Sequence, residues 1–418
     1  MKSENKNLCA PATAAAGARA LRSLVLALLA VEFLDELTFG TSEAAWPLVR
    51  DDLALRYAEI GLLLSAPRMF GNLVEPPLFM AAEAAGRRAF ITGGGALFAL
   101  SLALVSASMG FWSLLLALML LHPAAGAFVS LSQAALMDSQ PARREQNMAR
   151  WAFAGSAGQV AGSLAVASAV ALGAGWRTLF AALSVCTLAT LVTVRRFPLS
   201  TPVASTADEG PPQPAASRLA AFREGAATAW RALRRHEVVR WLALLELADL
   251  MLDGFHGFIA LYFVDVVGTT QGRAALAVAV WTGVGLAGDL LIIPLLERVR
   301  GLRCLRWSAA ASFVLLPLFL IAPGVPPKLF VLALLGLGNS GWYAILKAQL
   351  YAAMPGRSST AVALHSAAGI FGGLIPLALG LFAERFGLAA MMWLLLASPL
   401  SLLTLIPRAG KKGDDMLG

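Results

Sequence analysis

Long apolar runs alternate with short polar segments along almost the whole chain. Each run holds about 20 residues or more, the length that a helix needs to cross a bilayer. We count six runs in each half of the chain, near 22–48, 57–82, 89–108, 111–137, 147–173 and 177–194, then near 239–264, 271–296, 305–322, 328–353, 360–383 and 387–407. The pattern predicts an all-α membrane protein with twelve transmembrane helices. The expected divisions are an N-terminal tail (1–21), two bundles (22–194 and 239–407), a linker (195–238) and a C-terminal tail (408–418).

Acidic residues inside the apolar runs recur at a fixed spacing of 214 positions. The pairs are Glu32 and Glu246, Asp35 and Asp249, Glu75 and Asp289, and Glu83 and Glu297. The same offset relates Gly40 to Gly254 and Gly158 to Gly372. The repeat predicts two pseudo-symmetric bundles of six helices. A carboxylate at membrane depth is costly, so it usually marks a substrate or proton pathway.

Composition supports the membrane assignment and excludes several functions. Hydrophobic residues make up 58% of the chain, charged residues 14%, and the mean hydropathy is +0.71. A soluble domain carries about 25% charged residues. The net charge is +8, but the basic residues lie between the apolar runs and not in one patch, so they do not indicate nucleic-acid binding. Three cysteines are too few for a disulfide framework or a metal cluster. No phosphate-binding loop occurs, which argues against ATP as the energy source. No Ser-His-Asp or His-x-x-x-His pattern occurs, which argues against an enzyme, and we expect no cofactor.

The distribution of Lys and Arg predicts the orientation. If both termini are cytoplasmic, 25 of the 33 basic residues fall on the cytoplasmic side and six on the other. We therefore expect a multi-pass protein of the inner (plasma) membrane with cytoplasmic termini. The linker begins with a disordered Pro-, Ser- and Thr-rich stretch, and residues 218–235 are expected to form an amphipathic surface helix that tethers the halves.

Two groups of acids are expected to share helix faces near mid-membrane. They are Glu32, Asp35 and Glu36 on the first span, and Glu246, Asp249 and Asp253 on the seventh. We expect the two groups to face each other across a cavity. Clustered carboxylates cannot all be ionised cheaply, so at least one is expected to bind and release a proton.

Two basic residues lie within the predicted spans. Arg68 on the second span is expected to pair with Glu32 or Asp35 in a structural ion pair. Lys347 on the tenth span is expected to bind an anionic substrate group or to pair with an acid of the seventh span. The other interpretation of Lys347 is that it reaches the inner membrane surface.

The charge pattern and one loop resemble the major facilitator superfamily, over about residues 20–408. Predicted spans 3, 6, 9 and 12 lack interior charge, as do the peripheral helices of that family, and residues 79–88 read FMAAEAAGRR, a degenerate form of the loop signature after helix 2. In the second copy, Glu297 and Arg298 keep an acid and a base. The resemblance implies the major facilitator fold and a cytoplasmic latch; we assign to it Glu83, Arg87, Arg88, Asp138, Glu297 and Arg298. Ordinary loop charge is the alternative interpretation.

Two further segments are compared with family motifs. Residues 122–126 read HPAAG, at the place where proton-coupled members often carry Arg-x-x-x-Gly. His122 replaces the arginine and can titrate near neutral pH, or it is a packing residue near Pro123. Residues 154–163 read AGSAGQVAGS and match the antiporter motif of helix 5 only in part. Small residues at this spacing also simply let helices approach closely, which is the interpretation we favour.

Further polar residues on the spans are candidates for substrate binding. With Arg68 and Lys347 they are Gln133, His256, Asn339, Trp342 and Tyr343. Ser130, Ser132 and Ser340 are additional cavity candidates. The Trp and Tyr side chains can stack on a substrate ring, or they can be interface anchors or packing residues. His365 is expected to be a packing residue.

These observations favour a monomeric secondary transporter that exports a small organic compound in exchange for protons by alternating access. The first span and the following loop are similar to those of drug and fosmidomycin-resistance exporters. Two alternatives stay open. One is a divalent-metal transporter with Asp35, Asp249 and His256 as ligands. The other is a membrane receptor or enzyme that only borrows the fold.

Overall fold

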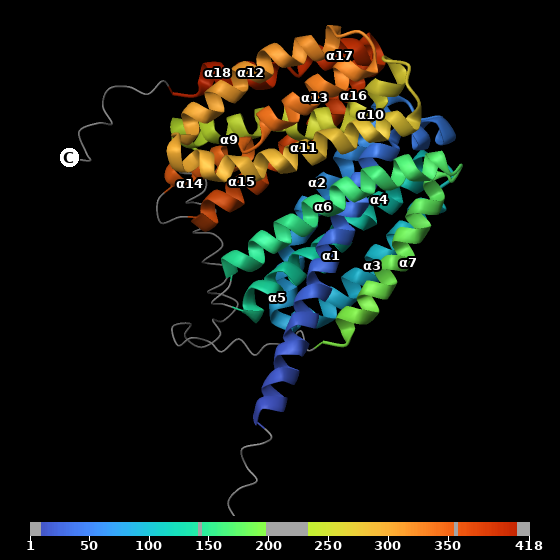
Figure 1. The fold of residues 1–418 in the computed structure, drawn as a ribbon, viewed down its shortest axis with the longest axis vertical. Helices are drawn as coiled ribbons and strands as arrows, with labels where there is room; N and C mark the ends of the chain where they lie inside the picture. The colour runs from blue at the N-terminus through green and yellow to red at the C-terminus, as the bar shows by residue number, and fades with distance from the viewer. Residues whose placement is uncertain (1–9, 141–143, 198–232, 355–357, 408–418) are drawn as a thin grey trace, which may run out of the picture.

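The computed structural model describes residues 10–140, 144–197, 233–354 and 358–407, and every regular element in these ranges is a helix. Most of the expected linker helix at 218–235 lies outside them. The N half, drawn blue to green in Figure 1, contains α1 (Ala10–Leu53), α2 (Tyr57–Ala85), α3 (Arg87–Ser106), α4 (Phe111–Ala125), η1 (Gly126–Ser130), α5 (Leu131–Ser139), α6 (Arg144–Ala171) and α7 (Trp176–Arg195).

The C half, drawn yellow to red in Figure 1, begins at α9. It contains α9 (His236–Asp249), η3 (Leu250–Gly254), α10 (Phe255–Asp265), α11 (Gln271–Arg298), α12 (Gly301–Ile321), α13 (Val325–Asn339), α14 (Trp342–Ala352), α15 (Ser358–Gly372), α16 (Ile375–Phe386), α17 (Leu388–Leu394) and α18 (Ala397–Leu405). Several expected spans are therefore built from two or three consecutive helical pieces.

Ten helical segments in the described ranges are long and apolar enough to cross a membrane. The first of them is α3 and the last is α17 with α18. α1 and α2 are also long, with 44 and 29 residues, but charged side chains such as Asp35 and Arg68 interrupt their apolar runs. The ten segments together with α1 and α2 are consistent with the twelve expected spans.

Several spans change their helical geometry near the middle. The fourth passes through the π-helical turn η1 and the seventh through η3. The tenth breaks between α13 and α14, where Gly341 has φ +74°, a conformation that favours glycine. Gly126, which opens η1, and Ser340, which precedes this break, are 214 positions apart. The repeat in the sequence thus corresponds to irregular backbone at equivalent places in the two halves.

Close helix contacts hold the structure together within and between the halves. Within the N half, a Cβ added to Gly158 of α6 would lie 2.3 Å from the carbonyl oxygen of Phe33 on α1. Between the halves, Gly61 of α2 and Gly380 of α16 bring their backbones into contact in the same way. The glycines of AGSAGQVAGS therefore serve close packing, the interpretation that the sequence favoured.

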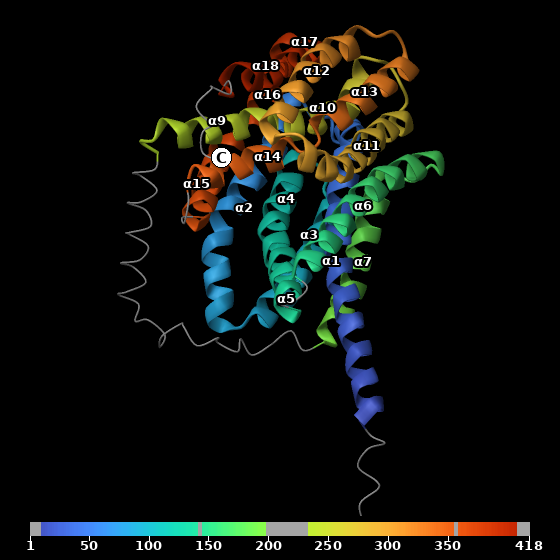
Figure 2. The same cartoon turned by 60° about the vertical axis from the view of Figure 1, so that its left-hand side comes forward.

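The two halves meet at one end of the molecule and separate toward the other. They meet where α1 ends, α2 begins and α10 ends, and they diverge toward α5 and α14 (Figures 1 and 2). α6 also packs on α11, and α2 on α16, across the boundary. We call the first the closed end and the second the open end.

Candidate functional site

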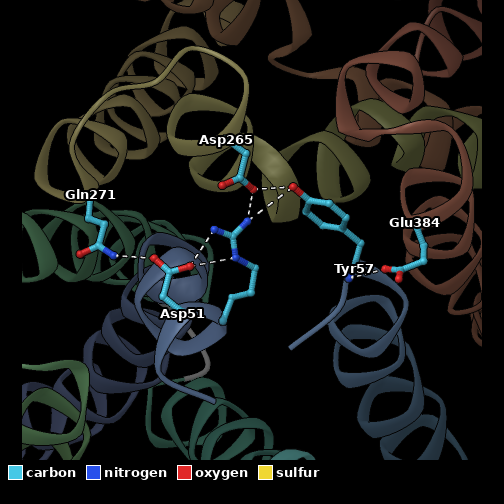
Figure 3. Close-up of polar contacts among 6 residues, drawn as sticks. Asp51, Tyr57, Asp265, Gln271 and Glu384 are labelled. Carbon is cyan, nitrogen blue, oxygen red and sulfur yellow. Dashed lines mark hydrogen bonds and ion pairs between the residues drawn. The ribbon is translucent and has the colours of Figure 1, made fainter. Parts of the chain in front are cut away.

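A cluster of polar side chains joins the two halves at the closed end (Figure 3). Arg50 at the end of α1 pairs with Asp265 at the end of α10, and the Tyr57 hydroxyl donates to Asp265 at 2.6 Å. Gln271 donates to Asp51 at 3.0 Å, and the backbone N–H of Tyr57 donates to Glu384 at 3.0 Å. We call these six residues the gate cluster: Arg50, Asp51, Tyr57, Asp265, Gln271 and Glu384. They close this end with contacts that run between the halves.

Three cavities lie beyond the gate cluster, and residues of both halves line each of them. Cavity A (about 230 Å³) lies between α1, α2, α4 and the seventh span and includes Asp35, Glu36 and Glu43. Cavity B (about 410 Å³) includes Glu246, Asp249 and Tyr343. Cavity C (about 560 Å³) lies mainly along α11 and the broken tenth span, with Asp289 and Asn339 on its wall. Asp253 lines all three cavities, so they surround a common centre.

The acids of the first span do not all face this centre. Asp35 and Glu36 line cavity A, as expected. Glu32 instead lies buried against α6, where a Cβ on Gly155 would be 2.6 Å from its Oε1, and it contacts Trp151. Its symmetry mate Glu246 packs in the same way against Gly372 of α15, yet it still lines cavity B. We expected all the acids of the first span to face those of the seventh span across a cavity, and this expectation is wrong for Glu32.

Arg68 contacts the seventh span, so the expected pairing with Glu32 or Asp35 is wrong. Its Nη1 donates to Asp253 Oδ2 at 2.7 Å, and Nη2 lies 3.8 Å from Asp249. The cause is geometric: Asp35 lines the same cavity, but η3 brings Asp253 within hydrogen-bond reach of the guanidinium. The pair therefore links the N half to the C half and is not internal to the N half.

Three expected titrating or binding groups, Glu246, His256 and His122, lie at the cavities. Both carboxyl oxygens of Glu246 are buried without a hydrogen-bond partner among the described residues. His256 is buried, packs edge-on against Phe39 at 5.7 Å between ring centroids, and leaves Nε2 without a partner in the same part of the chain. His122 lines cavity A.

The expected substrate-binding residues of the tenth span divide into two groups. Lys347 donates to the Tyr343 hydroxyl at 2.6 Å, and Tyr343 also lies 3.3 Å from His365, so these three form a polar chain beside cavity B. Trp342 lines cavity C, is fully buried and donates to the Ser308 hydroxyl at 2.8 Å, so it also has a packing role. His365 has a polar contact as well as its packing role.

Two other candidates have partners within their own half. Asn339 lines cavity C and accepts from Ser312 at 2.7 Å. Gln133 on α5 contacts the sulfur of Met148 at 3.7 Å and lines none of the three cavities.

Three of the residues assigned to the latch make polar contacts in the N half. Arg87 pairs with Asp138, at the end of α5, at 2.5 Å, and Arg88 donates to the carbonyl of Arg195 at 3.1 Å. The side chain of Glu83 lies outside the described residues. In the second copy, Glu297 and Arg298 are exposed at the end of α11, and Glu297 forms no ion pair within the described ranges.

The structure also brings acids to the site that the sequence analysis did not select. Glu43 is buried on the wall of cavity A; it stands seven residues after Glu36, and this spacing places both on one helix face. Glu75 lies against η1, where a Cβ on Gly126 would be 2.7 Å from its Oε1. Asp289, its mate in the repeat, accepts from the N–H of Gly341 at 3.1 Å. The 214-residue offset already related these last two acids, although it did not show that each contacts an interrupted helix.

A family model for the Major Facilitator Superfamily matches residues 28–376. This match covers most of the chain and includes both halves. The chain belongs to the Major Facilitator Superfamily. The expected fold is thereby confirmed, and the family assignment identifies the protein as a transporter and not an enzyme.

Solved transporters of this superfamily share the fold at low sequence identity. The nucleoside transporter NupG matches with a TM-score of 0.73 and 13% identity, covering 91% of this chain and 97% of that one. A bacterial homologue of the human lysosomal transporter Spinster, solved in an inward-facing state, matches with a TM-score of 0.66, 16% identity and 93% of each chain. A peptide transporter, POT, in complex with sulfate matches with a TM-score of 0.68, 14% identity and coverages of 92% and 94%. No curated protein matches the sequence.

The expected metal ligands of the alternative function do not come together in this superfamily member. Asp35 lines cavity A, Asp249 lines cavity B and His256 lines cavity C. Among the described residues, no group of three or more His, Cys, Asp or Glu side chains is placed to hold a metal ion. The geometry therefore gives no support to that alternative.

Proposed function

We propose that this superfamily member is a secondary active transporter that exports a small organic compound in exchange for protons. Both halves line the cavities, and contacts between the halves close one end. A reciprocal opening of the two ends would expose the same cavities to each side of the membrane in turn. With the closed end outside, as the Lys and Arg distribution predicts, the described state is inward-facing.

The observation that carries proton coupling is the environment of Glu246. Both of its carboxyl oxygens are buried and lack a hydrogen-bond partner among the described residues. A carboxylate held in this way at membrane depth is costly, and binding a proton removes that cost. Glu246 is thus suited to carry a proton through the membrane.

Arg68 supplies the link between protonation and movement of the halves. It bonds to Asp253 and lies close to Asp249, and both acids stand near Glu246 on the seventh span. A proton bound in this acidic group weakens the attraction of the group for the guanidinium. The ion pair between the halves then loosens, which favours a change of orientation. Asp35, Glu36 and His122, on the facing wall of cavity A, are the remaining proposed proton-coupling groups.

The test is coupled flux in proteoliposomes that contain a trapped pH-sensitive dye. Purified full-length protein is challenged with a panel of labelled compounds: uridine, leucine, 2-amino-1-phenylethanol and phenylacetate. The proposal predicts that a transported compound moves in the direction opposite to the protons, and that a pH gradient drives its accumulation. Movement with no pH change, or in the same direction as the protons, would contradict it.

A matched pair of variants shows whether Glu246 carries the proton. Glu246→Gln keeps the shape and removes the titratable group, and we expect it to retain downhill exchange of the compound while losing accumulation driven by the pH gradient. Glu237→Gln, at the exposed start of α9, is the control and should behave like the wild type. Normal gradient-driven accumulation by Glu246→Gln would exclude this residue as the carrier.

A further inference from the structure

On the wall of cavity A, two polar side chains each bury an atom that lacks a hydrogen-bond partner in the part of the chain that the structure describes. Glu43 and Trp46 are each only 5% exposed, and both line the cavity. Glu43 Oε2 and Trp46 Nε1 make no hydrogen bond within the described ranges. Buried polar atoms are nearly always paired, so two orphans in one cavity indicate a ligand that pairs them.

The two orphans have opposite hydrogen-bonding character and a fixed spacing. A carboxylate oxygen accepts, whereas an indole N–H only donates. Glu43 and Trp46 stand at i and i+3 on α1, so they share one helix face. A ligand that satisfies both must carry a donor and an acceptor on the same side of the molecule.

The charge of cavity A selects a cation. Its acids are Asp35, Glu36, Glu43 and Asp253, and its basic residues are Arg68 and His122, of which only the guanidinium is permanently charged. The guanidinium of Arg68 already forms an ion pair with Asp253 at 2.7 Å. Three carboxyl groups therefore face the cavity without a paired cation among the residues that line it, and a positively charged ligand would compensate them.

The remaining wall of cavity A is apolar and aromatic, and the space is small. Phe39, Leu63, Leu64, Leu118 and Leu121 line it together with the Trp46 ring. The volume of about 230 Å³ lies below the range of drug-sized pockets. Aromatic faces also attract cations. The wall therefore suits one apolar ring attached to a charged group.

We propose that cavity A binds a small protonated amine that carries one apolar ring and a hydroxyl or carbonyl group close to the nitrogen. The ammonium N–H donates to Glu43 Oε2, the neighbouring oxygen accepts from Trp46 Nε1, and the ring lies on the leucine wall. The site is next to the closed end, because Glu43 stands seven residues before Arg50 of the gate cluster on the same helix. The inference rests on the proposed transport function and names the class of its substrate.

The test is calorimetric binding to the purified full-length protein in detergent, without a pH gradient. The probes share a ring and differ in the polar group: 2-amino-1-phenylethanol, its N,N,N-trimethyl derivative, 1-phenyl-1,2-ethanediol and mandelate. We expect the primary amine to bind, the trimethyl derivative to bind about 10-fold more weakly because it lacks an N–H, and the neutral diol and the anion not to bind.

Three variants assign the binding to the two orphan atoms. Glu43→Gln should weaken binding of the amine by about 10-fold or more, and Trp46→Phe by about 5-fold because it keeps the ring and loses the N–H. Glu43→Asp keeps the charge and should retain part of the affinity. The control Glu237→Gln should bind like the wild type. A thermal unfolding curve of each variant shows that it is folded.

Several results would overturn the inference, and they are distinct from failure of the transport proposal. Equal affinity of the wild type, Glu43→Gln and Trp46→Phe would place the amine elsewhere. Preference for mandelate or the diol, or no binding of the amine at millimolar concentration, would exclude the proposed substrate class. By contrast, normal amine binding without coupled proton flux in proteoliposomes would leave the site intact and refute the antiport.

Discussion

The guanidinium of Arg68 donates to the carboxylate of Asp253 at 2.7 Å, from α2 in one half of the chain to η3 in the other. This bond crosses the boundary between the halves among the three cavities. The gate cluster holds α1 and α2 to the C half at the closed end, and the N–H of Leu377 on α16 donates to the Ser65 hydroxyl on α2 at 2.9 Å. In the proposed mechanism, Arg68 responds to the charge of the seventh span and changes the packing of the halves.

A double-mutant cycle tests the Arg68 pair. Arg68→Ala should cost about 1–3 kcal/mol of stability, less than the ~3–5 kcal/mol of a fully buried pair, because the side chains are 34% and 45% exposed. Adding Asp253→Asn should recover part of that loss in thermal unfolding measured in detergent. The control cycle combines Arg68→Ala with Asp35→Asn and should be additive. Additivity in the first cycle and coupling in the second would restore the pairing that the sequence suggested.

Two glycine substitutions test the packing that buries Glu246. A Cβ on Gly372 would lie 1.7 Å from Glu246 Oε2, so Gly372→Ala must displace this carboxyl group and should cost about 1–3 kcal/mol. Gly93→Ala on α3 is the matched control, because its Cβ would meet nothing within 4 Å and alanine favours a helix. Adding Glu246→Ala should relieve the strain in Gly372→Ala. A Gly372→Ala protein as stable as the control would show that Glu246 is not held there.

The gate cluster should control access from the closed end. Asp265→Asn removes the charge that holds Arg50 and weakens the acceptor for Tyr57, so the closed end should open more often. In a protein without native cysteines, a cysteine at Ser42 in cavity A should then react several-fold faster with a membrane-impermeant maleimide added outside. Glu59→Gln is the control, because within the described ranges Glu59 pairs with Arg56 of its own turn and with no residue of the C half. Equal labelling rates in the protein with the Ser42 cysteine alone, with Asp265→Asn and with Glu59→Gln would show that Asp265 does not control access.

Asp52 gives a pH-dependent contribution to stability. A hydrogen bond from Arg177 holds the pKa of this carboxyl below its usual range, and Trp176 also donates to it, at 3.1 Å. The contribution is therefore present above the ordinary pKa of about 4 and is lost as the pH falls through the lowered value. Asp52 is 44% exposed, so Asp52→Asn should cost at most about 1 kcal/mol at pH 6. Thermal unfolding at pH 6 and pH 3 should show the difference from the wild type shrinking at the lower pH; a constant difference would contradict it.

The repeat in the sequence predicted more of the fold than of the site. Apolar run length and the 214-residue offset were enough to predict two related bundles, because the bilayer fixes the length of a span and a duplicated chain repeats its packing. The offset even related Glu75 to Asp289, and both contact an interrupted helix. Propensity does not show where a helix changes to a π turn, so the positions of η1 and η3 were not predicted.

The orientation of individual side chains depends on neighbours that are distant in sequence. Glu32 shares a helix face with Glu36, yet Gly155 of α6 opens a place for it away from the cavities. Arg68 reaches Asp253, 185 residues away, and not the acids of the first span. Glu43 and Trp46 stand among many similar residues of α1, and the sequence alone does not show that their polar atoms are buried without a partner among the described residues.

Reciprocal movement of the two ends under control of protons is the central claim, and paired spin labels measure it directly. In a protein without native cysteines, one pair at Arg56 and Val266 reports on the closed end and a second at Ser139 and Ala348 on the open end. Pulsed distance measurements in nanodiscs at pH 8 and pH 5 should show one distance distribution lengthening while the other shortens. Glu246→Gln should give the same distributions at both pH values. Distances that are independent of pH in the wild type, or ends that open together, would contradict the account.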